Sequence, residues 1–412
     1  MLKQTLYATI AAAALMCSAG FASAKCTIEG SGEVDIIANS FPVLDHIGKA
    51  MQGCSSDKLK VNVKLTDKAR IETEQAFKAG TSPFEAAHVS NGQFVALYSQ
   101  GLLQPITDLV KKYKDKYKLE DRMLVTVGDD VYAIAFMANA QHLFYRKDLF
   151  EKNGIAPPKT FDDVLAASEK LKKAGMDTPY AGAFKAGWDL ATEYTNIYLG
   201  MGGEFFEKGS AKGVFNNDKG IKTLELMKKL QAYMSPNALA LATGEVTTAF
   251  QQGQSAVGML WGSRAANMND DKVSKVAGQI VFAAAPSVTP GGKPASAIWW
   301  DAFAMPKAMD GNRDLAFQVM MEGLSEETMK SGMEKTVWLR SGYKPSPEAM
   351  GIDATLKGGA ADWPDEPYFA LAHTALGKNA ADYLAGRKTA QEALADASKE
   401  YDQTAREKGF IK

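Results

Sequence analysis

Alternation of apolar and polar positions predicts short strands and helices at the start of the chain. Residues 34–38 form a short apolar run, and Leu59–Leu65 places leucine or valine at every second position, the period of a strand. Residues 43–52 and 68–79 carry apolar side chains at helical spacing, and residues 86–89 form the next strand. Strand, helix, strand, helix, strand with short links predicts an open α/β sheet with parallel strands.

The middle of the chain changes pattern. Residues 131–136 are almost wholly apolar and alternate like a strand, and a second extended run follows at 143–145. This segment is either one long central strand or the place where the chain leaves one lobe and enters another. Thr160 and Asp163 then form an approximate capping box, which predicts a helix that ends at Gly175.

The last third shows the same kinds of signal. A short strand is predicted at 256–260, directly before Trp261, and residues 283–294 contain three prolines and two glycines, which is typical of a linker. An extended run follows at 297–304, and helices are predicted at 312–323 and 389–408. The last of these begins with the capping box Thr389-Ala390-Gln391-Glu392.

The first residues are typical of a secretory signal. Lys3 gives a positive start, an apolar stretch follows, and Ala22-Ser23-Ala24 offers a cleavage site before Lys25. A membrane anchor is the alternative, but the apolar stretch is too short to span a bilayer. We therefore expect a signal peptide at 1–24, a mature chain that starts at Lys25, and a periplasmic location.

Charge excludes some classes of partner. Without residues 1–24 the chain keeps 46 of its 47 basic residues and all 48 acidic ones, a formal net charge of −2. Neither a basic excess nor a basic run is present, so the sequence predicts no nucleic-acid or anionic-membrane partner. The length favours two domains.

Cysteines remain at Cys26 and Cys54 once Cys17 has left with the signal. A pair in an exported protein most often forms a disulfide, and two free buried thiols are the alternative. On the chain-entropy model the bond would stabilise its lobe by roughly 3 kcal/mol.

Several stretches of the sequence resemble a known family. They include V-Y-A-I-A-F…L-F-Y-R-K-D-L-F-E-K-N-G-I from Val131, F-V-A-L-Y-S-Q-G-L-L from Phe94, T-T-A-F-Q-Q-G-Q-S-A-V-G-M-L-W-G-S-R from Thr247, and A-G-R-K-T-A-Q-E-A-L from Ala385. Together they resemble the sugar-binding solute-binding proteins of bacterial ABC importers, extracellular family 1, whose members are maltose-binding-protein-like. The matches are separated words spread over nearly all of residues 25–409.

The resemblance implies an α/β, two-lobe periplasmic-binding-protein fold of class II type, with discontinuous lobes and a hinge. It places 25–138 plus 289–342 in an N-terminal lobe and 139–288 plus 343–412 in a C-terminal lobe, with crossings near Ala138, Val288 and Gly342. Such a protein is no enzyme and has no cofactor. It captures a carbohydrate or polyol in an interlobe cleft as a monomer, and delivers it to the membrane permease subunits of an ABC importer.

The chemistry of sugars indicates which residues to expect in that cleft. Aromatic rings bury the C–H faces of a sugar, while amides, carboxylates and guanidinium groups bind its hydroxyls. Trp188 and Trp261 fall at predicted loops or strand ends, although a tryptophan is more often a core residue. Adjacent Trp299 and Trp300 must point to opposite faces of an extended segment, and we expect Trp300, beside Asp301, to face the ligand.

Polar candidates follow predicted strands. Asn39 and the Ser90-Asn91 pair lie where parallel strands end, although a turn explains these residue types equally well. Many relatives carry an acidic sugar ligand where this chain has Ser90-Asn91, a departure from the family pattern. Asn139 lies where relatives often place a polar group toward the sugar.

Gly262 and Arg340 are two further candidates. Gly262 follows Trp261 at the predicted start of a helix whose amide groups would face the cleft. Arg340 would either clamp hydroxyls or an anionic group of the ligand, or form an inter-lobe salt bridge.

Other chemistry has little support in the sequence. The histidines are scattered without metal-ligand spacing, so we predict no metal site. Nucleophile-elbow and phosphate-loop motifs are absent from strand-to-helix contexts. Paired carboxylates of a secreted glycosidase or lyase remain an alternative, because such pairs lie far apart in a chain. A solute-sensing module for a chemoreceptor or kinase is another.

Overall fold

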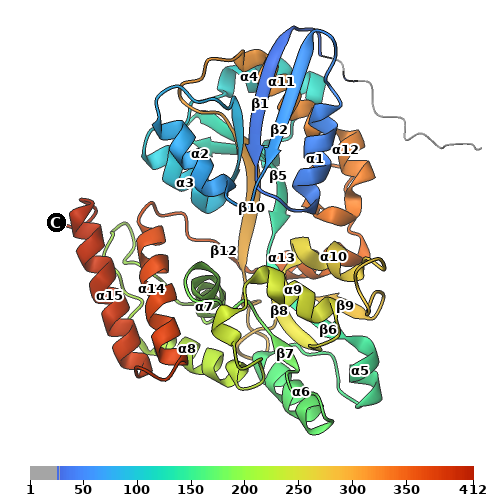
Figure 1. Cartoon of the computed structure of the whole chain (residues 1–412). Helices are drawn as coiled ribbons and strands as arrows, with labels where there is room; N and C mark the ends of the chain where they lie inside the picture. Colours follow the sequence, from blue (N-terminus) through green and yellow to red (C-terminus); the bar gives the residue numbers. More distant parts are fainter. Residues whose placement is uncertain (1–25, 27) are drawn as a thin grey trace, which may run out of the picture.

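The computed structural model describes residue 26 and residues 28–412, so the predicted signal peptide lies outside the described residues. Its elements form two lobes, each built around its own β-sheet with helices packed on it (Figure 1). The predicted two-lobe α/β fold is confirmed. We call the lobe around the larger sheet the first lobe and the other the second lobe.

The sheet of the first lobe has the order β11-β5-β10-β3-β1-β2, with β4 paired to β5 and β12 to β10. As predicted, β1 pairs in parallel with β2 and β3. By contrast, β10 runs antiparallel to β3 and β5, because it enters this sheet from the second lobe. The bounds are β1 (Gly32–Ala38), β2 (Leu59–Leu65), β3 (Ala86–Ser90), β4 (Leu124–Val127), β5 (Asp130–Asn139), β10 (Ala297–Ala304), β11 (Val337–Trp338) and β12 (Ala361–Asp362).

Both faces of this sheet are buried under helices. Ile36 and Phe303 belong to the core on one face, whereas the neighbours Ile37 and Ala302 belong to the core on the other face. This is the consequence of strand alternation in a sheet that helices cover on both sides. The helices are α1 (Pro42–Gln52), α2 (Ala69–Lys78), α3 (Asn91–Ser99), α4 (Thr107–Tyr117), η1 (Asp121–Met123), α11 (Arg313–Gly323), α12 (Glu326–Ser331) and η4 (Met333–Lys335).

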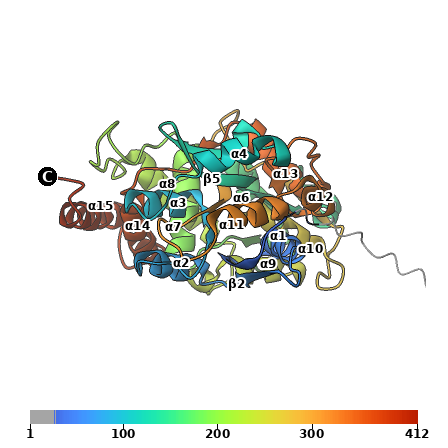
Figure 2. The same ribbon diagram turned by 90° about the horizontal axis from the view of Figure 1, so that it is seen from above.

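The sheet of the second lobe has the order β7-β8-β6-β9. Its strands are β6 (Gln141–Arg146), β7 (Tyr180–Ala181), β8 (Val257–Trp261) and β9 (Ile280–Ala283). Helices α14 and α15 pack on each other at one end of the molecule (Figure 2), and α14 also packs on α7. The helices are α5 (Lys147–Lys152), α6 (Phe161–Lys173), α7 (Trp188–Gly200), α8 (Asp218–Gln231), η2 (Ala238–Ala240), α9 (Thr243–Gln251), η3 (Gly262–Arg264), α10 (Ala265–Asn269), η5 (Pro347–Ala349), α13 (Met350–Lys357), α14 (Phe369–Leu384) and α15 (Ala390–Glu407).

Local sequence signals set several of these boundaries. Thr160 and Asp163 form a complete capping box at the start of α6, and Thr389 and Glu392 form another at the start of α15. Gly175 has a φ of 94°, a left-handed conformation that glycine adopts without strain, just beyond the end of α6. Both predicted helix starts are confirmed.

The mid-chain segment is a crossing between lobes rather than one long strand. β5 ends at Asn139 in the sheet of the first lobe, and β6 begins at Gln141 in the sheet of the second lobe. Ala140 between them is fully buried, in a small apolar core with Val337 and Ile352. The chain therefore passes between lobes through a packed segment.

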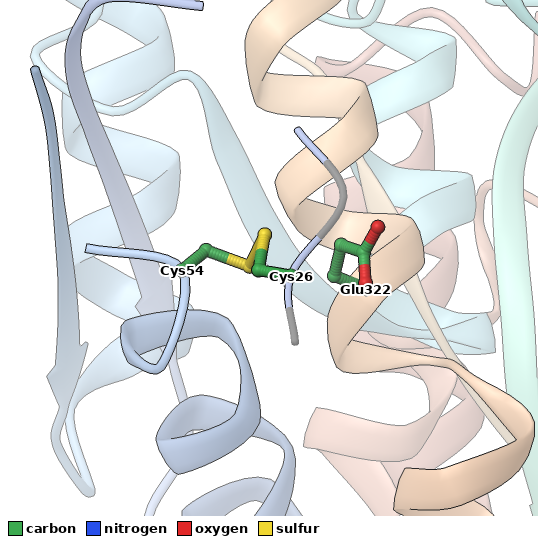
Figure 3. Close-up of side chains that lie close together, drawn as sticks. All are labelled: Cys26, Cys54 and Glu322. Carbon is green, nitrogen blue, oxygen red and sulfur yellow. A yellow bond between two sulfur atoms is a disulfide. The ribbon is translucent and has the colours of Figure 1, made fainter. Parts of the chain in front are cut away.

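The predicted disulfide is present in the first lobe. Cys26 is bonded to Cys54, which lies just beyond the end of α1, and the carboxylate of Glu322 on α11 lies beside the bond (Figure 3). Because the sulfurs are bonded to each other, this group does not offer the thiolates of a metal site. The bond ties the start of the described chain to the end of α1.

Candidate functional site at the junction of the lobes

Hydrogen bonds of Asn139 join the lobes at the crossing. Its Nδ2 donates to Oγ of Ser263 at 3.3 Å, and its Oδ1 accepts from the backbone N–H of Ser263 at 3.3 Å and of Ala140 at 3.0 Å. Ser263 belongs to η3 of the second lobe, and Asn139 is buried. The structure therefore gives the predicted ligand residue Asn139 a bonding role within the protein.

Tryptophan rings gather beside this crossing, and we call Trp188, Trp261, Trp299 and Trp363 the tryptophan cluster. The rings of Trp261 and Trp299 lie 5.5 Å apart, and the ring of Trp188 lies 6.3 Å from Trp261 and 6.0 Å from Trp299. Trp363 packs edge-on against Trp299 at 4.5 Å. Trp188 is 41% exposed, whereas Trp261 and Trp299 are each 8% exposed. Trp188 thus offers the most open ring.

Backbone packing fixes Trp188 over the other rings. Trp188 is the first residue of α7 and follows Gly187, whose φ is 102°. A Cβ at Gly377 on α14 would lie 2.2 Å from the carbonyl oxygen of Gly187, so only glycine allows α14 to approach this closely. The small residues around Trp188 thereby allow α7 and α14 to bring its ring onto the cluster.

His373 on α14 adds a neutral ring to the same cluster. Its ring lies 5.8 Å from Trp188 and 5.5 Å from Trp363, and its Nε2 lies 3.2 Å from Oγ1 of Thr192. Burial lowers the pKa of His373 to about 3, and the positive charge of Arg70 acts in the same direction. The imidazole therefore stays uncharged near neutral pH and extends the apolar wall.

Trp299 and Trp300 do point to opposite faces, as the sequence predicts. Trp299 belongs to the core of the second lobe with the tryptophan cluster, whereas Trp300 packs against Phe94 of α3 at 5.7 Å. The structure therefore brings Trp299 to the cluster and leaves Trp300, the predicted ligand residue, on the other side of β10. Trp363, which no feature of the sequence singled out, completes the cluster.

Asp301 is buried and bonded within the first lobe. Nε2 of His88 on β3 lies 2.9 Å from Oδ1 of Asp301, and each residue is at most 6% exposed. The ring of His88 packs edge-on against Phe41 at 5.8 Å. A buried carboxyl requires such a partner, and His88 supplies it. The sequence reasoning placed Asp301 near the ligand but did not predict its contact with His88.

The predicted polar residues after β1 and β3 lie in the first lobe, where they bond to nearby backbone groups. Oδ1 of Asn39 accepts from the N–H of Ser40 at 2.7 Å, and Oγ of Ser90 caps α3 by accepting from the N–H of Gln93 at 3.4 Å. Asn91 is buried, and its Nδ2 donates to the carbonyl oxygen of Ile298 at 3.5 Å. These bonds are the turn and cap roles that the sequence left open beside ligand binding.

Gly262 has a packing role. Its N–H donates to the carbonyl oxygen of Ala140 at 3.0 Å, and a Cβ at this position would lie 2.1 Å from the side chain of Ile352. The backbone N–H of Gly262, which the sequence predicted to face the ligand, is thus bonded to Ala140 in the crossing segment.

Arg340 is anchored in the first lobe rather than in an inter-lobe ion pair. Its Nη1 donates to the carbonyl oxygen of Tyr117 at the end of α4, at 3.0 Å. A cation at the carboxyl end of a helix is favourable, although burial lowers the pKa of Arg340. Within residue 26 and residues 28–412, no contact joins Arg340 to the tryptophan cluster.

Arg264 is a cation that lies at the junction. It ends η3, directly after Ser263, and its guanidinium carbon lies 5.9 Å from the centre of the Phe41 ring in the first lobe. Burial lowers the pKa of Arg264, while the nearby carboxylate of Asp67 acts in the opposite direction. A cation over a ring is favourable, especially when it is partly desolvated. The sequence analysis named Gly262, two residues before Arg264, but did not single out Arg264 itself.

Gln141 and Glu193 form a buried polar pair behind the cluster. Nε2 of Gln141, the first residue of β6, donates to Oε1 of Glu193 on α7 at 2.9 Å. Burial raises the pKa of Glu193 to about 8, and the charge of Asp189 adds to the increase. In the register of the sheet Gln141 lies opposite Trp261. The pair therefore supports the strand ends that carry the tryptophan cluster.

This geometry can be compared with known proteins. Residues 58–319, more than half of the chain, match the family model described as bacterial extracellular solute-binding protein. The protein belongs to this family. The predicted resemblance is thus confirmed, and the family consists of binding proteins rather than enzymes, which removes the glycosidase alternative.

Relatives in sequence support the assignment. An uncharacterized ABC transporter extracellular-binding protein of Pyrococcus horikoshii is 28% identical over 193 residues, which are 45% of this chain and 44% of that protein. A probable sugar-binding periplasmic protein of Mesorhizobium japonicum is 28% identical over 144 residues, 33% of this chain and 34% of that protein. The chain thus matches less than half the length of these curated relatives.

Solved structures match the whole fold. A solute-binding protein of an ABC transporter from Agrobacterium radiobacter K84, in complex with ribitol, has a TM-score of 0.80 at 20% identity, covering 91% of this chain and 99% of that chain. Maltose-bound MalE3 of T. maritima has a TM-score of 0.78 at 18% identity, covering 90% and 99%. No helix in the described part of this chain is long and apolar enough to cross a membrane.

Proposed function

We propose that this solute-binding protein captures a neutral carbohydrate or polyol between its lobes and delivers it to the permease subunits of an ABC importer. The observation that carries the proposal is the tryptophan cluster at the lobe junction, with the open ring of Trp188 above the buried rings of Trp261 and Trp299. Sugars and polyols present C–H groups to such rings and hydroxyls to the polar groups around them. The ribitol and maltose in the solved relatives belong to the same chemical class.

Closure of the lobes is the functional step of this proposal. Trp188 and Trp261 belong to the second lobe, while Ser90 and Asp301 are paired in the sheet of the first lobe. A ligand that contacts both sides stabilises the closed arrangement over the open one. The permease subunits would then recognise the closed form.

Processing and lobe boundaries complete the proposal. We propose export to the periplasm as a monomer that begins at Lys25, with 25–138 plus 289–342 in the N-terminal lobe and 139–288 plus 343–412 in the C-terminal lobe. The intact mass of protein from the periplasm tests the first residue. Limited proteolysis tests the boundaries: cleavage should concentrate near the crossings and surface loops, and bound ligand should protect the crossings.

Thermal unfolding with a panel of ribitol, D-mannitol, D-tagatose, D-glucose and maltose tests the ligand class. A ligand that binds only the folded protein at about one hundred times its Kd stabilises it by about 2.7 kcal/mol, which gives a clear increase in Tm. Native mass spectrometry of protein from the periplasm adds any ligand that co-purifies. A co-purified amino acid or peptide, with no response to the panel, would contradict the proposal.

A further inference from the structure

His142 is a buried histidine directly after the first crossing between the lobes. It is the second residue of β6, two positions beyond Ala140, and its side chain is fully buried. One face of its ring stacks on the ring of Phe144 at 4.3 Å, and the ring of Phe282 on β9 stands almost perpendicular to it at 6.2 Å. An imidazole thus occupies a place at the crossing that apolar rings surround.

Two glycines hold this ring between elements that meet at the crossing. A Cβ at Gly351 on α13 would lie 2.3 Å from Nδ1 of His142, and a Cβ at Gly262 of η3 would lie 2.8 Å from Cδ2. Only glycine lets these two backbones come so close to the ring. The N–H of Gly262 is also bonded to the carbonyl oxygen of Ala140 at 3.0 Å. The ring therefore has no space to turn while α13, η3 and the crossing segment stay packed together.

The surroundings of the ring suit its neutral form. Nδ1 lies 3.2 Å from the carbonyl oxygen of Leu143, whereas Nε2 is buried and has no hydrogen-bond partner among residue 26 and residues 28–412. A neutral imidazole has one N–H group, while the cation has two and needs an acceptor for each. Burial lowers the pKa of His142 from 6.5 to about 4, and the carbonyl groups of Leu143 and Ala283 offset only part of this effect.

The charged groups on the neighbouring elements do not compensate for a proton on this ring. All residues of β8 and β9 are uncharged. Arg146 on β6 and Arg264 in η3 are cations, which repel a second positive charge. Asp353 on α13 pairs with Lys357 at 2.7 Å, and Glu348 in η5 accepts from an asparagine side chain at 2.8 Å. Both carboxylates thus have other partners.

We propose that His142 is an acid-sensitive latch of the crossing: when the ring takes up a proton from solvent, it leaves its place between Gly262 and Gly351, and α13 separates from the crossing segment. In the open form the cation lies in water, where both N–H groups find acceptors. Opening also frees the segment that carries Asn139, whose bonds to Ser263 join the lobes. Release of a ligand in acid would follow, and this consequence alone rests on the proposed function.

Hydrogen–deuterium exchange of the ligand-free mature protein tests the latch between about pH 6.5 and 4.5. Mass spectrometry follows the backbone N–H groups of residues 138–143 and 260–264 in wild type, His142→Asn and His46→Asn, after correction for the intrinsic pH dependence of exchange. The N–H groups of β2 report unfolding of the whole protein. His46→Asn is the matched control, because His46 lies on α1 in the first lobe, with its Nε2 2.9 Å from the carbonyl oxygen of Thr328.

Wild type should lose protection at the crossing by at least about tenfold over this pH range, while β2 keeps its protection. The open form, with the usual pKa of a histidine, binds the proton more tightly than the closed form does, so a falling pH favours opening. His46→Asn should match wild type. In His142→Asn a neutral amide, smaller than the ring, takes its place and does not titrate, so this loss of protection should be absent.

Selective ¹⁵N labelling of the four histidines gives a second measurement on wild type. The signal that is missing in His142→Asn, or in His142→Gln if the first variant does not fold, belongs to His142. Its change to the imidazolium form should follow the loss of protection at the crossing.

Three outcomes would overturn the latch. They are an equal loss of protection in wild type and His142→Asn, an imidazolium signal of His142 without a loss of protection, and a loss of protection in β2 at the same pH as at the crossing. The last would mean that acid unfolds the whole protein. Because no ligand is added, each of these outcomes leaves the proposed function standing, and that function fails separately if wild type responds to none of the neutral ligands.

Discussion

The indole rings of Trp261 and Trp299 lie 5.5 Å apart with their planes inclined by only 23°, although Trp261 ends a strand of one sheet and Trp299 belongs to a strand of the other. Each ring is almost fully buried. The contact therefore ties the two sheets together and forms a rigid base. Trp188 lies over this base with much of its ring open to solvent, so the cluster combines a structural layer with a ring that a ligand can contact.

This division of roles predicts different effects of removing the rings. Trp188→Ala should weaken binding of the identified neutral ligand by about tenfold or more, which corresponds to about 1.4 kcal/mol, because the open stacking face is lost. Its effect on the free energy of unfolding should be small, since the ring is 41% exposed. Trp261→Ala should instead destabilise the protein by about 3–5 kcal/mol, the usual cost of emptying a buried aromatic site. Calorimetry and urea denaturation measure the two quantities.

Phe410→Ala is the matched control, because Phe410 near the C-terminus is 39% exposed and lies outside the cluster. It should leave affinity unchanged. Trp300→Ala decides between the sequence and the structure, since the sequence placed Trp300 on the ligand side and the structure packs it against Phe94. Wild-type affinity in Trp188→Ala, together with a large loss in Trp300→Ala, would show that the site lies on the other side of β10.

The tryptophans also show how far the sequence could lead. Strand alternation requires Trp299 and Trp300 to point to opposite faces, and they do. It does not say which face meets the second lobe, because that depends on the angle at which β10 leaves one lobe for the other. Trp363 could not be found at all, since it reaches the cluster only through contacts between elements far apart in the chain.

The roles of the charged residues Arg340 and Arg264 could not be predicted from the sequence either. Arg340 lies near a predicted lobe crossing and Arg264 follows the predicted helix start at Gly262, and the sequence offered no reason to prefer Arg264. What separates them is burial against specific partners: the carbonyl oxygen of Tyr117 for Arg340, and the ring of Phe41 for Arg264. By contrast, the capping boxes and the disulfide depend on local spacing or on residue type and compartment, and these predictions were confirmed.

The disulfide should stabilise the fold without affecting binding. Replacing Cys26 and Cys54 together by serine should lower the free energy of unfolding by roughly 3 kcal/mol, because the unfolded chain gains the freedom of an open loop. Affinity should stay near wild type, since Cys54 lies beyond the end of α1 whereas Phe41 precedes its start. Urea denaturation with tryptophan fluorescence measures the change. Equal stability of the oxidised wild type and the double variant would contradict it.

Buried Glu193 should make stability depend on pH. Its pKa is raised from the usual 4.5 to about 8 in the folded protein. Between these values the folded protein holds a proton that the unfolded chain has released, so the stability from Glu193 is full below about pH 4.5 and declines as pH rises through 8. The decline should amount to a few kcal/mol, since one pKa unit corresponds to about 1.4 kcal/mol.

Glu193→Gln isolates this contribution. The free energy of unfolding of Glu193→Gln minus that of wild type should rise with pH between about 5 and 8. Buried His142, whose pKa is lowered to about 4, gives a slope of the opposite sign at lower pH, but it is present in both proteins and cancels in the difference. A difference that does not change with pH would mean that Glu193 is ionised in the folded protein.

Asn139 should matter more for the junction than for the ligand. Asn139→Ala removes the acceptor of the buried N–H groups of Ala140 and Ser263, so it should destabilise the protein by about 1–3 kcal/mol. Ser263→Ala is the matched comparison, because it removes only the hydroxyl that accepts from Nδ2 of Asn139 and keeps the backbone contacts. Ser263→Ala should cost less stability than Asn139→Ala.

Both variants should bind the neutral ligand more tightly than Trp188→Ala does, because a neutral hydrogen bond to a ligand hydroxyl yields a net of only about 0.5–1.5 kcal/mol. Urea denaturation and calorimetry on the three proteins measure this order. A stability close to wild type in Asn139→Ala, with binding nearly abolished, would instead place its amide on the ligand.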